Sequence, residues 1–399
     1  MGDIEQRRNE TAIAVRVASG MAEIDVAGWD ACTRGADSSA ASKRSDNPFI
    51  SHAFLAALEQ SGSVSRDAGW LPQHLLFEDE SGRLLGAMPC YQKSHSLGEY
   101  VFDHGWADAY ERAGGSYYPK LQCAVPFTPV PGPRLLARDG DERTRAILLQ
   151  AAALLTEQLS ASSLHITFLT QHEWELAGKL GFLKRTGQQF HWRNAGYGRF
   201  EDFLGALSSR KRKAIRNERR RALAHGIEIE WVTGAGLTEA HWDAFFRFYL
   251  NTGSRKWGSP YLNREFFSLI GRSMADQILL VMARRGGRYI AGALNFIGAD
   301  TLYGRYWGAI EEHDCLHFEV CYYQAIDFAI QHKLGTVEAG AQGEHKLARG
   351  YLPVMTYSAH WIRDPGFRRA VADYLRRERA AVDREAALLA EESPYRKCD

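Results

Sequence analysis

Residues 342–348 read QGEHKLA, and residues 171–177 read QHEWELA. Gln, Glu, Leu and Ala match in the two segments at a constant offset of 171 residues. A second pair of segments, SGRLLGAM at 81–88 and GGRYIAGAL at 286–294, is similar apart from one inserted residue. Self-similarity at a fixed distance is the signature of a repeated unit. We therefore predict that the chain arose by internal duplication.

The elements around these segments follow the same order in both halves. In the first half we expect a strand and short helix over 12–32, a helix over 50–62, a hairpin over 74–93, a helix over 143–161 and a strand over 164–170. In the second half we expect a helix over 263–275, a hairpin over 278–298, a strand over 301–310, a buried helix over 318–335 and a strand over 336–340. This alternation predicts a mixed α/β fold with two similar domains, residues 1–197 and 198–399.

The first copy is longer than the second by about 34 residues, an estimate of where the repeat was interrupted. The additional residues fall in the aromatic stretch 94–133, which we read as a long insertion. Long loops inside compact domains are commonly functional, and the aromatic content argues against disorder. We expect this stretch to form a substrate-binding wall through Asp103, His104, Trp106, Tyr117, Tyr118 and Lys120.

Composition restricts the class of protein. The net charge of +1 excludes a protein that attracts polyanions over its whole surface. No apolar run reaches the ~18–20 residues that a membrane span needs, and residues 1–11 contain no apolar segment typical of a secretory signal. The six cysteines form no CxxC pair and no zinc-type spacing with histidine. We expect a cytoplasmic protein with reduced thiols, no membrane span and no metal.

The two copies differ in charge at the repeated segment. Glu175 occupies the position of Lys346, and Gly178 occupies the position of Arg349. The cationic pair is therefore not required for folding and indicates a function of the second copy. Lys346 and Arg349 lie three residues apart, so on one helical turn they share a face and suit a phosphate, a carboxylate or an oxyanion. The same block supplies Glu338, Gln342 and His345 as candidate substrate-binding residues. The alternative is a solvated basic turn.

Three further segments supply candidates. His317 and Glu319 begin the helix over 318–335 and are candidate proton acceptors, although Glu319 could equally be a helix cap. In the strand YGRYWG, 303–308, alternation predicts that Tyr303, Arg305 and Trp307 share one face and that Tyr306 points to the other. The segment 251–262 reads as an aromatic loop, with Arg255 and Lys256 as candidate pocket residues or as ordinary surface residues.

Residues 208–226 predict a basic helix with eight Arg or Lys side chains. Two interpretations compete. The helix could bind RNA or another phosphate-rich ligand, or it could be a solvated connection between the domains, with Ile215, Ala222 and Leu223 on its inner face.

Several blocks together resemble the Fem-like N-acyltransferases, a family with two tandem GNAT-like domains. The blocks are NPFISHAFLAALEQSGSV (47–64), GEYVFDHGWADAYERAGGSYYPKL (98–121), AVPFTPVPGPRLL (124–136), SRKRKAIRNERRRA (209–222), LHFEVCYYQAIDFAI (316–330) and GEHKLARGY (343–351). They are similar to the branch described as peptidoglycan biosynthesis or recognition proteins, over residues 48–380. Two features depart from the family. The basic helix is too short for the coiled-coil arm of some Fem enzymes, and neither copy has a Q/R-x-x-G-x-G/A acetyl-CoA loop.

The resemblance implies an N-acyltransferase with its acceptor in a cleft between the domains. It implies that Lys346 lies at the transfer site, and that Arg210 to Arg221 contact phosphates of a nucleotide-linked acceptor. The donor would be an acyl-CoA or an aminoacyl-tRNA, and the acceptor a small-molecule or peptide amine, such as a peptidoglycan precursor. From the residues themselves we expect Lys346 to stabilise an oxyanion and Glu319, or His317, to relay the amine proton. The alternative is a non-catalytic protein that binds a muropeptide or nucleotide-sugar.

Overall fold

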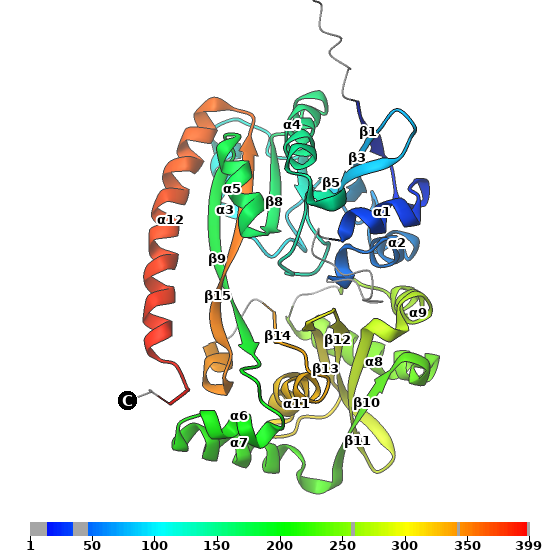
Figure 1. Ribbon diagram of the computed structural model, residues 1–399, viewed down its shortest axis with the longest axis vertical. Helices are drawn as coiled ribbons and strands as arrows, with labels where there is room; N and C mark the ends of the chain where they lie inside the picture. Colours follow the sequence, from blue (N-terminus) through cyan, green and yellow to red (C-terminus); the bar gives the residue numbers. More distant parts are fainter. Residues whose placement is uncertain (1–13, 35–46, 257–259, 341–343, 397–399) are drawn as a thin grey trace, which may run out of the picture.

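Both halves of the chain contribute to one continuous eleven-stranded sheet (Figure 1). The computed structural model describes residues 14–34, 47–256, 260–340 and 344–396. The strand order in the large sheet is β10-β11-β12-β13-β14-β9-β15-β8-β6-β5-β2, and a smaller sheet has the order β1-β3-β4-β7. The strands are β1 (Val15–Ala18), β2 (Trp70–Pro72), β3 (His74–Glu78), β4 (Leu84–Met88), β5 (Cys90–Lys93), β6 (Lys120–Cys123), β7 (Leu136–Ala137), β8 (Ser163–Leu169), β9 (Leu183–Arg193), β10 (Ile227–Thr233), β11 (Ile278–Arg285), β12 (Arg288–Ile297), β13 (Thr301–Ala309), β14 (Thr336–Glu338) and β15 (Leu352–Ile362).

The helices cover both faces of the sheets, as a mixed α/β fold requires. They are α1 (Val26–Thr33), α2 (His52–Gln60), α3 (His104–Arg112), α4 (Glu142–Gln158), α5 (Gln171–Lys179), α6 (Phe200–Ala206), α7 (Ser209–Ala222), α8 (Glu239–Lys256), α9 (Arg264–Ser273), α10 (Leu316–Phe318), α11 (Gln324–Gln331) and α12 (Pro365–Glu391). A π-helical turn, η7 (Glu319–Tyr323), joins α10 to α11, and a 3₁₀ helix, η8 (Glu344–Arg349), follows β14.

Local signals account for many of the element ends. The side chain of Ser51 accepts a hydrogen bond from the Phe54 amide and begins α2, as Asn263 does for α9. Thr170 and Glu173 form a capping box at α5. Gly286 and Gly287 both have positive φ, at 55° and 76°, and make the predicted turn between β11 and β12. The predicted helices and strands are confirmed, with small shifts at their ends.

The two repeats exchange their last strands. Each half contains one parallel strand pair, β6 with β8 and β13 with β14. At the offset of 171 residues, β8, α5 and β9 correspond to β14, η8 and β15. However, β9 pairs with β14 of the other repeat, and β15 pairs with both β8 and β9. Figure 1 shows β9 and β15 running side by side between the two halves.

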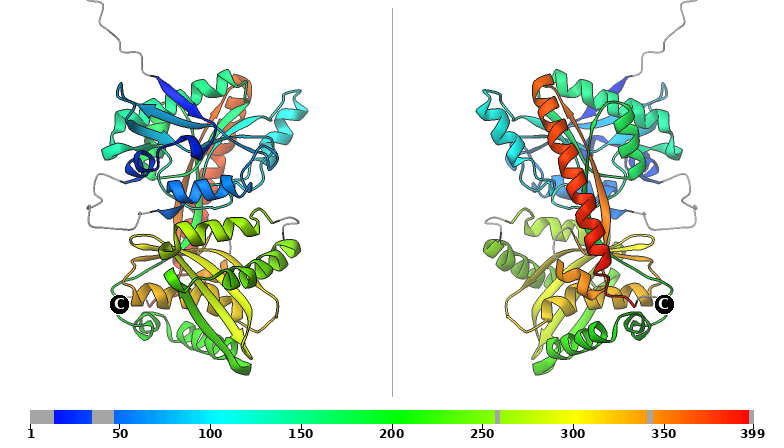
Figure 2. Two further views of the ribbon diagram at one scale, coloured as in Figure 1. Left: turned by 90° about the vertical axis from the view of Figure 1, so that its right-hand side faces the viewer. Right: turned by 90° about the vertical axis from the view of Figure 1, so that its left-hand side faces the viewer.

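This exchange bears on the domain boundary, which stays a prediction. Strand β15 and helix α12 follow residue 198 in sequence but pack on strands of the first half. In Figure 2, α12 lies along β9 and β15 on one side of the molecule. Its Val371 and Leu375 are buried in one cluster with Trp106 and Tyr117 of the first half.

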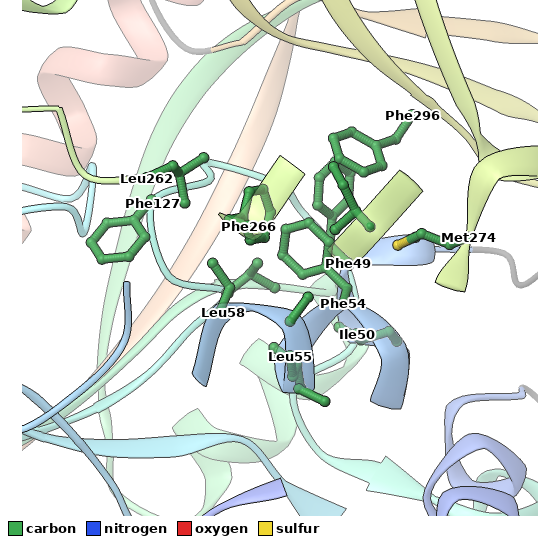
Figure 3. Close-up of a cluster of buried hydrophobic side chains, with 14 of the residues drawn as sticks. Phe49, Ile50, Phe54, Leu55, Leu58, Phe127, Leu262, Phe266, Met274 and Phe296 are labelled. Carbon is green, nitrogen blue, oxygen red and sulfur yellow. The ribbon is translucent and has the colours of Figure 1, made fainter. Parts of the chain in front are cut away.

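An apolar core also joins the two halves on the other side of the exchange (Figure 3). Phe54 of α2 packs edge-on against Phe266 of α9 and Phe296 of β12, with ring centroids 5.7 and 5.5 Å apart. Phe49 lies against Phe296 at 4.7 Å. These four side chains are buried within a single cluster that contains residues of both repeats. Apolar burial therefore stabilises the arrangement of the two repeats.

Two predicted loops are wrong in part. The stretch 94–133 contains the helix α3 and the strand β6, which is a central strand of the large sheet. Residues 251–256, predicted as a loop, are the end of α8. Helix α7 confirms the predicted basic helix, and Cys32, Cys90 and Cys123 are buried free thiols as expected. Cys398 lies outside the described residues.

The chain shows no sign of a membrane-spanning helix in its described part. Among those residues, no helix combines the length and the apolar character that crossing a bilayer demands.

The inter-repeat core predicts a large effect for one truncation. Phe54→Ala should lower the free energy of unfolding by about 3–5 kcal/mol, because it leaves a cavity between α2, α9 and β12. The matched control is Phe102→Ala, whose side chain is 54% exposed; we expect less than about 1 kcal/mol there. The measurement is urea unfolding followed by tryptophan fluorescence. Equal losses in the two variants would contradict the assignment of this core.

Candidate functional site

The site begins where two parallel strands separate. Strands β13 and β14 pair only over Thr301–Thr336, Leu302–Val337 and Tyr303–Glu338. Strand β13 then continues to Ala309, whereas β14 ends at Glu338. We call the gap bounded by Gly304–Ala309, Glu338–Gly340 and Lys346 the strand split. Among the described residues, no strand pairs with this part of β13 on the side of β14, although the carbonyls of Gly304 and Ala309 accept hydrogen bonds from the side chains of Arg305 and Asn251. A ligand can therefore approach the strand from that side.

A β-bulge at Arg305 sets which side chains face each side of the strand split. The pairing of β12 with β13 skips Arg305: Asn295 pairs with Gly304, and Leu294 pairs with Tyr306. The extra residue reverses the alternation after it. The predicted facing is therefore wrong. Tyr303 and Tyr306 lie in the core between the repeats, and Trp307 packs in the second-half core on the other face.

On the face toward the first repeat, three charged or titratable side chains lie on three adjacent strands. Arg305 of β13 forms a buried ion pair with Oε2 of Glu338 on β14. The other carboxylate oxygen, Oε1, lies 3.3 Å from Nε2 of His191 on β9. Burial raises the pKa of Glu338, but the charge of Arg305 and the hydrogen bond from His191 outweigh it, and the pKa lies below its ordinary value. Glu338 is therefore an ionised carboxylate between two nitrogen groups.

Arg305 is held in place but keeps one donor for a ligand. Its guanidinium carbon lies 4.9 Å above the Phe49 ring and 5.3 Å from the Tyr303 ring. Its Nη1 donates to the carbonyl of Gly304. Its Nε is buried and has no hydrogen-bond partner among the described residues. Orphaned buried donors are uncommon, and this one is available to an oxygen atom of a ligand.

Lys346 reaches the same gap from the following turn. Its Nζ donates to the carbonyl of Gly340 at 2.9 Å, and its side chain is 2% exposed. Gly340 has a φ of 76°, which favours glycine and lets the chain leave β14 toward η8. Burial lowers the pKa of Lys346 from 10.5 to about 8, and the charge of Arg305 acts in the same direction. A buried amine with three donors suits a developing oxyanion.

The other face of the strand split opens into a pocket of about 250 Å³. Thr252, Trp307, Ala309, Glu311, Glu312, His313, Leu316 and His317 line it. His317 packs edge-on against Trp307 at 5.3 Å, and His345 lies near it, its Nε2 2.9 Å from the Tyr322 hydroxyl. Three of the predicted residues, His317, His345 and Trp307, therefore lie together on this side of the gap.

Glu319 and Arg349 are occupied by the basic helix. Arg219 of α7 donates to both oxygens of Glu319, and Gln324 donates to Oε1 at 2.7 Å. Glu319 is fully buried, so it is a poor candidate for a proton acceptor. Arg349 forms a bidentate pair with Glu218 of α7 and lies 3.4 Å above the Phe318 ring. Sequence reasoning missed Glu218, and this pairing leaves Arg349 little capacity for a ligand phosphate.

The residues predicted as an aromatic substrate wall form a separate buried network. Lys120 binds Glu99 and Asp103, and Tyr117 donates to Asp103 at 2.6 Å. Trp106 packs on His360 at 4.9 Å. This network lies under α3 and α12 around β6, β8 and β15, and strands β14 and β9 separate it from the strand split in the sheet. His104 is exposed beside Phe102, and Tyr118 binds Ser96.

Tyr100 and Phe127 of this stretch approach the split, and neither was predicted: the Phe127 carbonyl accepts a hydrogen bond from the Tyr306 hydroxyl, and Tyr100 feels the charge of Arg305. Burial raises the pKa of the Tyr100 hydroxyl, and the charge of Arg305 acts in the opposite direction. The Tyr100 φ of 61° is in the left-handed region, which is uncommon for an aromatic residue and is found preferentially at functional sites. Gln342 lies outside the described residues, as do the side chains of Arg255 and Lys256.

The corresponding place in the first copy is filled. Thr167 of β8 occupies the position of Glu338, and its carbonyl accepts a hydrogen bond from the buried Arg134 side chain. Arg134 also donates to the carbonyls of Val130, Gly132 and Pro133. The Pro-rich segment thus closes the first copy, and the open split belongs to the second copy, where the late block carries Lys346.

Comparison with known proteins agrees with this architecture. The model of the FemAB-like family, described as peptidoglycan biosynthesis/recognition, matches residues 20–397. The chain belongs to the FemAB-like family. A search of curated proteins found no match. Within the described residues of this FemAB-like chain, no group of three or more His, Cys, Asp or Glu could hold a metal ion.

Solved structures place the fold. A crystal structure of FemX has a TM-score of 0.54 at 12% identity, covering 88% of this chain and 98% of FemX. The structure of L-PGS from Bacillus licheniformis has a TM-score of 0.49 at 10% identity, covering 80% of this chain and 95% of that chain. A tandem GNAT protein from the clavulanic acid biosynthesis pathway has a TM-score of 0.46 at 11% sequence identity, covering 88% of this chain and 99% of that chain. At 12% identity, the similarity to FemX shows that this FemAB-like chain shares its fold.

Burial of the Lys346 amine predicts a pH-dependent effect on stability. Its pKa is about 8 in the fold and 10.5 ordinarily, so the unfolded chain binds the proton more tightly. The cost of burying Lys346 is complete below pH 8 and falls as the pH rises toward 10.5. The melting temperature of wild type should therefore rise relative to that of Lys346→Met between pH 8 and 10. The exposed Lys179→Met should show a constant difference; the same behaviour in Lys346→Met would contradict the burial effect.

Proposed function

We propose that this FemAB-like chain is an N-acyltransferase that moves an acyl or aminoacyl group from an acyl-CoA or aminoacyl-tRNA to an amine of a peptidoglycan precursor. The observation that carries the proposal is the strand split with the buried Lys346 at its edge. A gap between two parallel strands lets an acyl group lie in line with the sheet while its carbonyl meets donors on both sides.

The two faces of the strand split suit two substrates. The pocket at Trp307 and His317 opens on the face of α10, and we assign it to the donor. The opposite face carries Arg305, Glu338 and His191 and lies against the first repeat, so we assign it to the acceptor. The acceptor nitrogen then attacks the acyl carbonyl carbon inside the gap. The C–S or C–O bond to the donor breaks, and the thiolate or alkoxide leaves.

Lys346 supplies the electrostatic contribution. When the carbonyl oxygen becomes an oxyanion, a charged Nζ can donate to it in place of Gly340. Because the gap is largely buried, this interaction is stronger than it would be in water. The description of the FemAB-like family, peptidoglycan biosynthesis/recognition, supports an acceptor of this class. The similarity to FemX, at 12% identity, supports the fold alone.

Replacing Lys346 tests the proposal. With acetyl-CoA, longer acyl-CoAs and aminoacyl-tRNA offered together with a lysine-containing muramyl pentapeptide, Lys346→Ala should lower kcat by about 10²–10³-fold, as removal of an oxyanion donor does. Ligand-induced increases in melting temperature should remain.

Lys179→Ala, at an exposed position of α5, is the matched control and should keep wild-type turnover. Ligand binding by wild type without any turnover would instead favour a protein that only recognises a muropeptide or nucleotide-sugar.

Helix α7 bears on which donor is used. Its C-terminal half is structural, since Arg219 binds Glu319 and Arg221 binds Asp314. Its first turns carry Arg210, Lys211, Arg212 and Lys213, which have no ion pair among the described residues. Four cations at a helix N-terminus oppose the helix dipole, so they suit an external anion. This half of α7 favours aminoacyl-tRNA over acyl-CoA as the donor.

Salt dependence tests this second point. Changing all four cations to Gln should weaken tRNA binding and reduce the slope of log Kd against log salt by about 1 for each phosphate that the variant no longer neutralises. Fluorescence anisotropy with a labelled tRNA measures both quantities. Arg369→Gln/Arg377→Gln on exposed positions of α12 is the control. An unchanged slope in the α7 variant would exclude these cations from RNA binding.

A further inference from the structure

We propose that His191 is the proton acceptor for the attacking amine, oriented by Glu338, with Arg305 as the positioning residue for that carboxylate. This inference rests on the proposed function and names a catalytic group at the same site. Glu319, the acceptor favoured by sequence, is held by Arg219 and Gln324, so the site requires another base.

The geometry is that of a histidine with an orienting carboxylate. His191 and Glu338 are direct partners in the antiparallel pairing of β9 with β14, so their side chains share one face. Nε2 of His191 lies 3.3 Å from Glu338 Oε1 and 3.4 Å from Gln189 Oε1. Both neighbours are acceptors, which places the ring proton on Nε2 and leaves the lone pair on Nδ1.

Arg305 fixes the carboxylate in turn. It binds the oxygen of Glu338 that His191 does not use, so each oxygen has one nitrogen partner. The nucleophile–base–orienter arrangement of acyl-transfer sites has the same logic. Gln189 is itself held, since its Nε2 donates to the carbonyl of Pro129 at 2.6 Å. Sequence offered no signal for His191, because its role depends on a partner 147 positions later, Glu338.

The surroundings of His191 allow a change of charge. His191 contacts Glu338 of β14 and Gln189 of its own strand. Arg305 of β13 binds the far oxygen of the Glu338 carboxylate. Strand β15 places the apolar Leu352 opposite His191. Lys346 follows β14 and interacts with Arg305 and Glu338. A positive His191 would be next to a negative Glu338, and its side chain is 11% exposed, which leaves a path for a proton.

The step balances. The neutral acceptor amine attacks the acyl carbon and forms the C–N bond, and the nitrogen loses one proton to Nδ1 of His191. Collapse of the tetrahedral intermediate breaks the bond to sulfur or oxygen. The leaving thiolate or alkoxide takes the proton from His191, which returns to its neutral state. No metal or redox partner takes part in this sequence.

The test combines kinetics and NMR on the full chain. In the transfer assay described above, His191→Gln should lower kcat by about 10²–10⁴-fold, the usual contribution of a general base, with KM changed less than about threefold. The acidic limb of the pH–rate profile should disappear in this variant. Imidazole added to His191→Gly should restore part of the rate. His172→Gln, an exposed histidine of α5, is the matched control.

A ¹⁵N-histidine spectrum gives a readout that does not need turnover. Wild type should show His191 as the Nε2–H tautomer, and Glu338→Gln should change both that signal and its titration midpoint. A full rate for His191→Gln while Lys346→Ala is inactive would overturn this inference and leave the proposed function standing. Loss of the acidic limb in His317→Gln instead would move the base to His317. If the His191 signal is the same in Glu338→Gln as in wild type, the inference about His191 is also overturned. This outcome can be read even when no donor supports turnover.

Discussion

The shortness of one strand pairing determines the rest of the site. Strands β13 and β14 share three residue pairs and then separate, which opens the sheet at its middle. Every group that we assign to chemistry lies at that opening: Arg305 at the bulge, Glu338 at the last pair, His191 on the next strand and Lys346 on the following turn. A longer β14 would satisfy the backbone of β13 and close the gap.

The duplication shows how one scaffold can be open in one copy and closed in the other. In the first copy a buried Arg134 binds carbonyls of β8 and its own loop, where the second copy has the gap. In the first copy these hydrogen bonds of Arg134 hold the loop on the strand, at the place where the second copy has room for a ligand. The buried network of Lys120 and Asp103 likewise strengthens the first repeat beneath α3 and α12. In our proposals the first repeat supports the acceptor face through Phe49 and Tyr100 and supplies His191, and the second repeat supplies Arg305, Glu338 and Lys346.

Sequence reasoning recovered the periodic elements and the repeat, because hydrophobic periodicity and similarity between the copies are local signals. The charge difference between the copies pointed to Lys346, whose catalytic role stays a prediction. Sequence reasoning failed where pairing across the sheet decides. A β-bulge breaks the alternation at Tyr303, Arg305 and Trp307, and no residue near it in sequence predicts that bulge. The carboxylate of Glu319 is bound by an arginine 100 positions away in the chain. The proposed role of His191 depends on the strand register that pairs it with Glu338 of β14. Most of the residues predicted as an aromatic substrate wall are buried inside the first repeat, which the sequence pattern did not predict.

The exchange of last strands has a consequence for how the chain is made. Strand β15 pairs with β8 across 195 residues at His165 and His360, a contact that cannot form until the second repeat has been synthesised as far as β15. Until then β8 and β9 present unpaired edges, which are templates for association with other chains. High-contact-order pairing of this kind is slow. The first repeat therefore cannot complete its sheet until β15 of the second repeat has been synthesised.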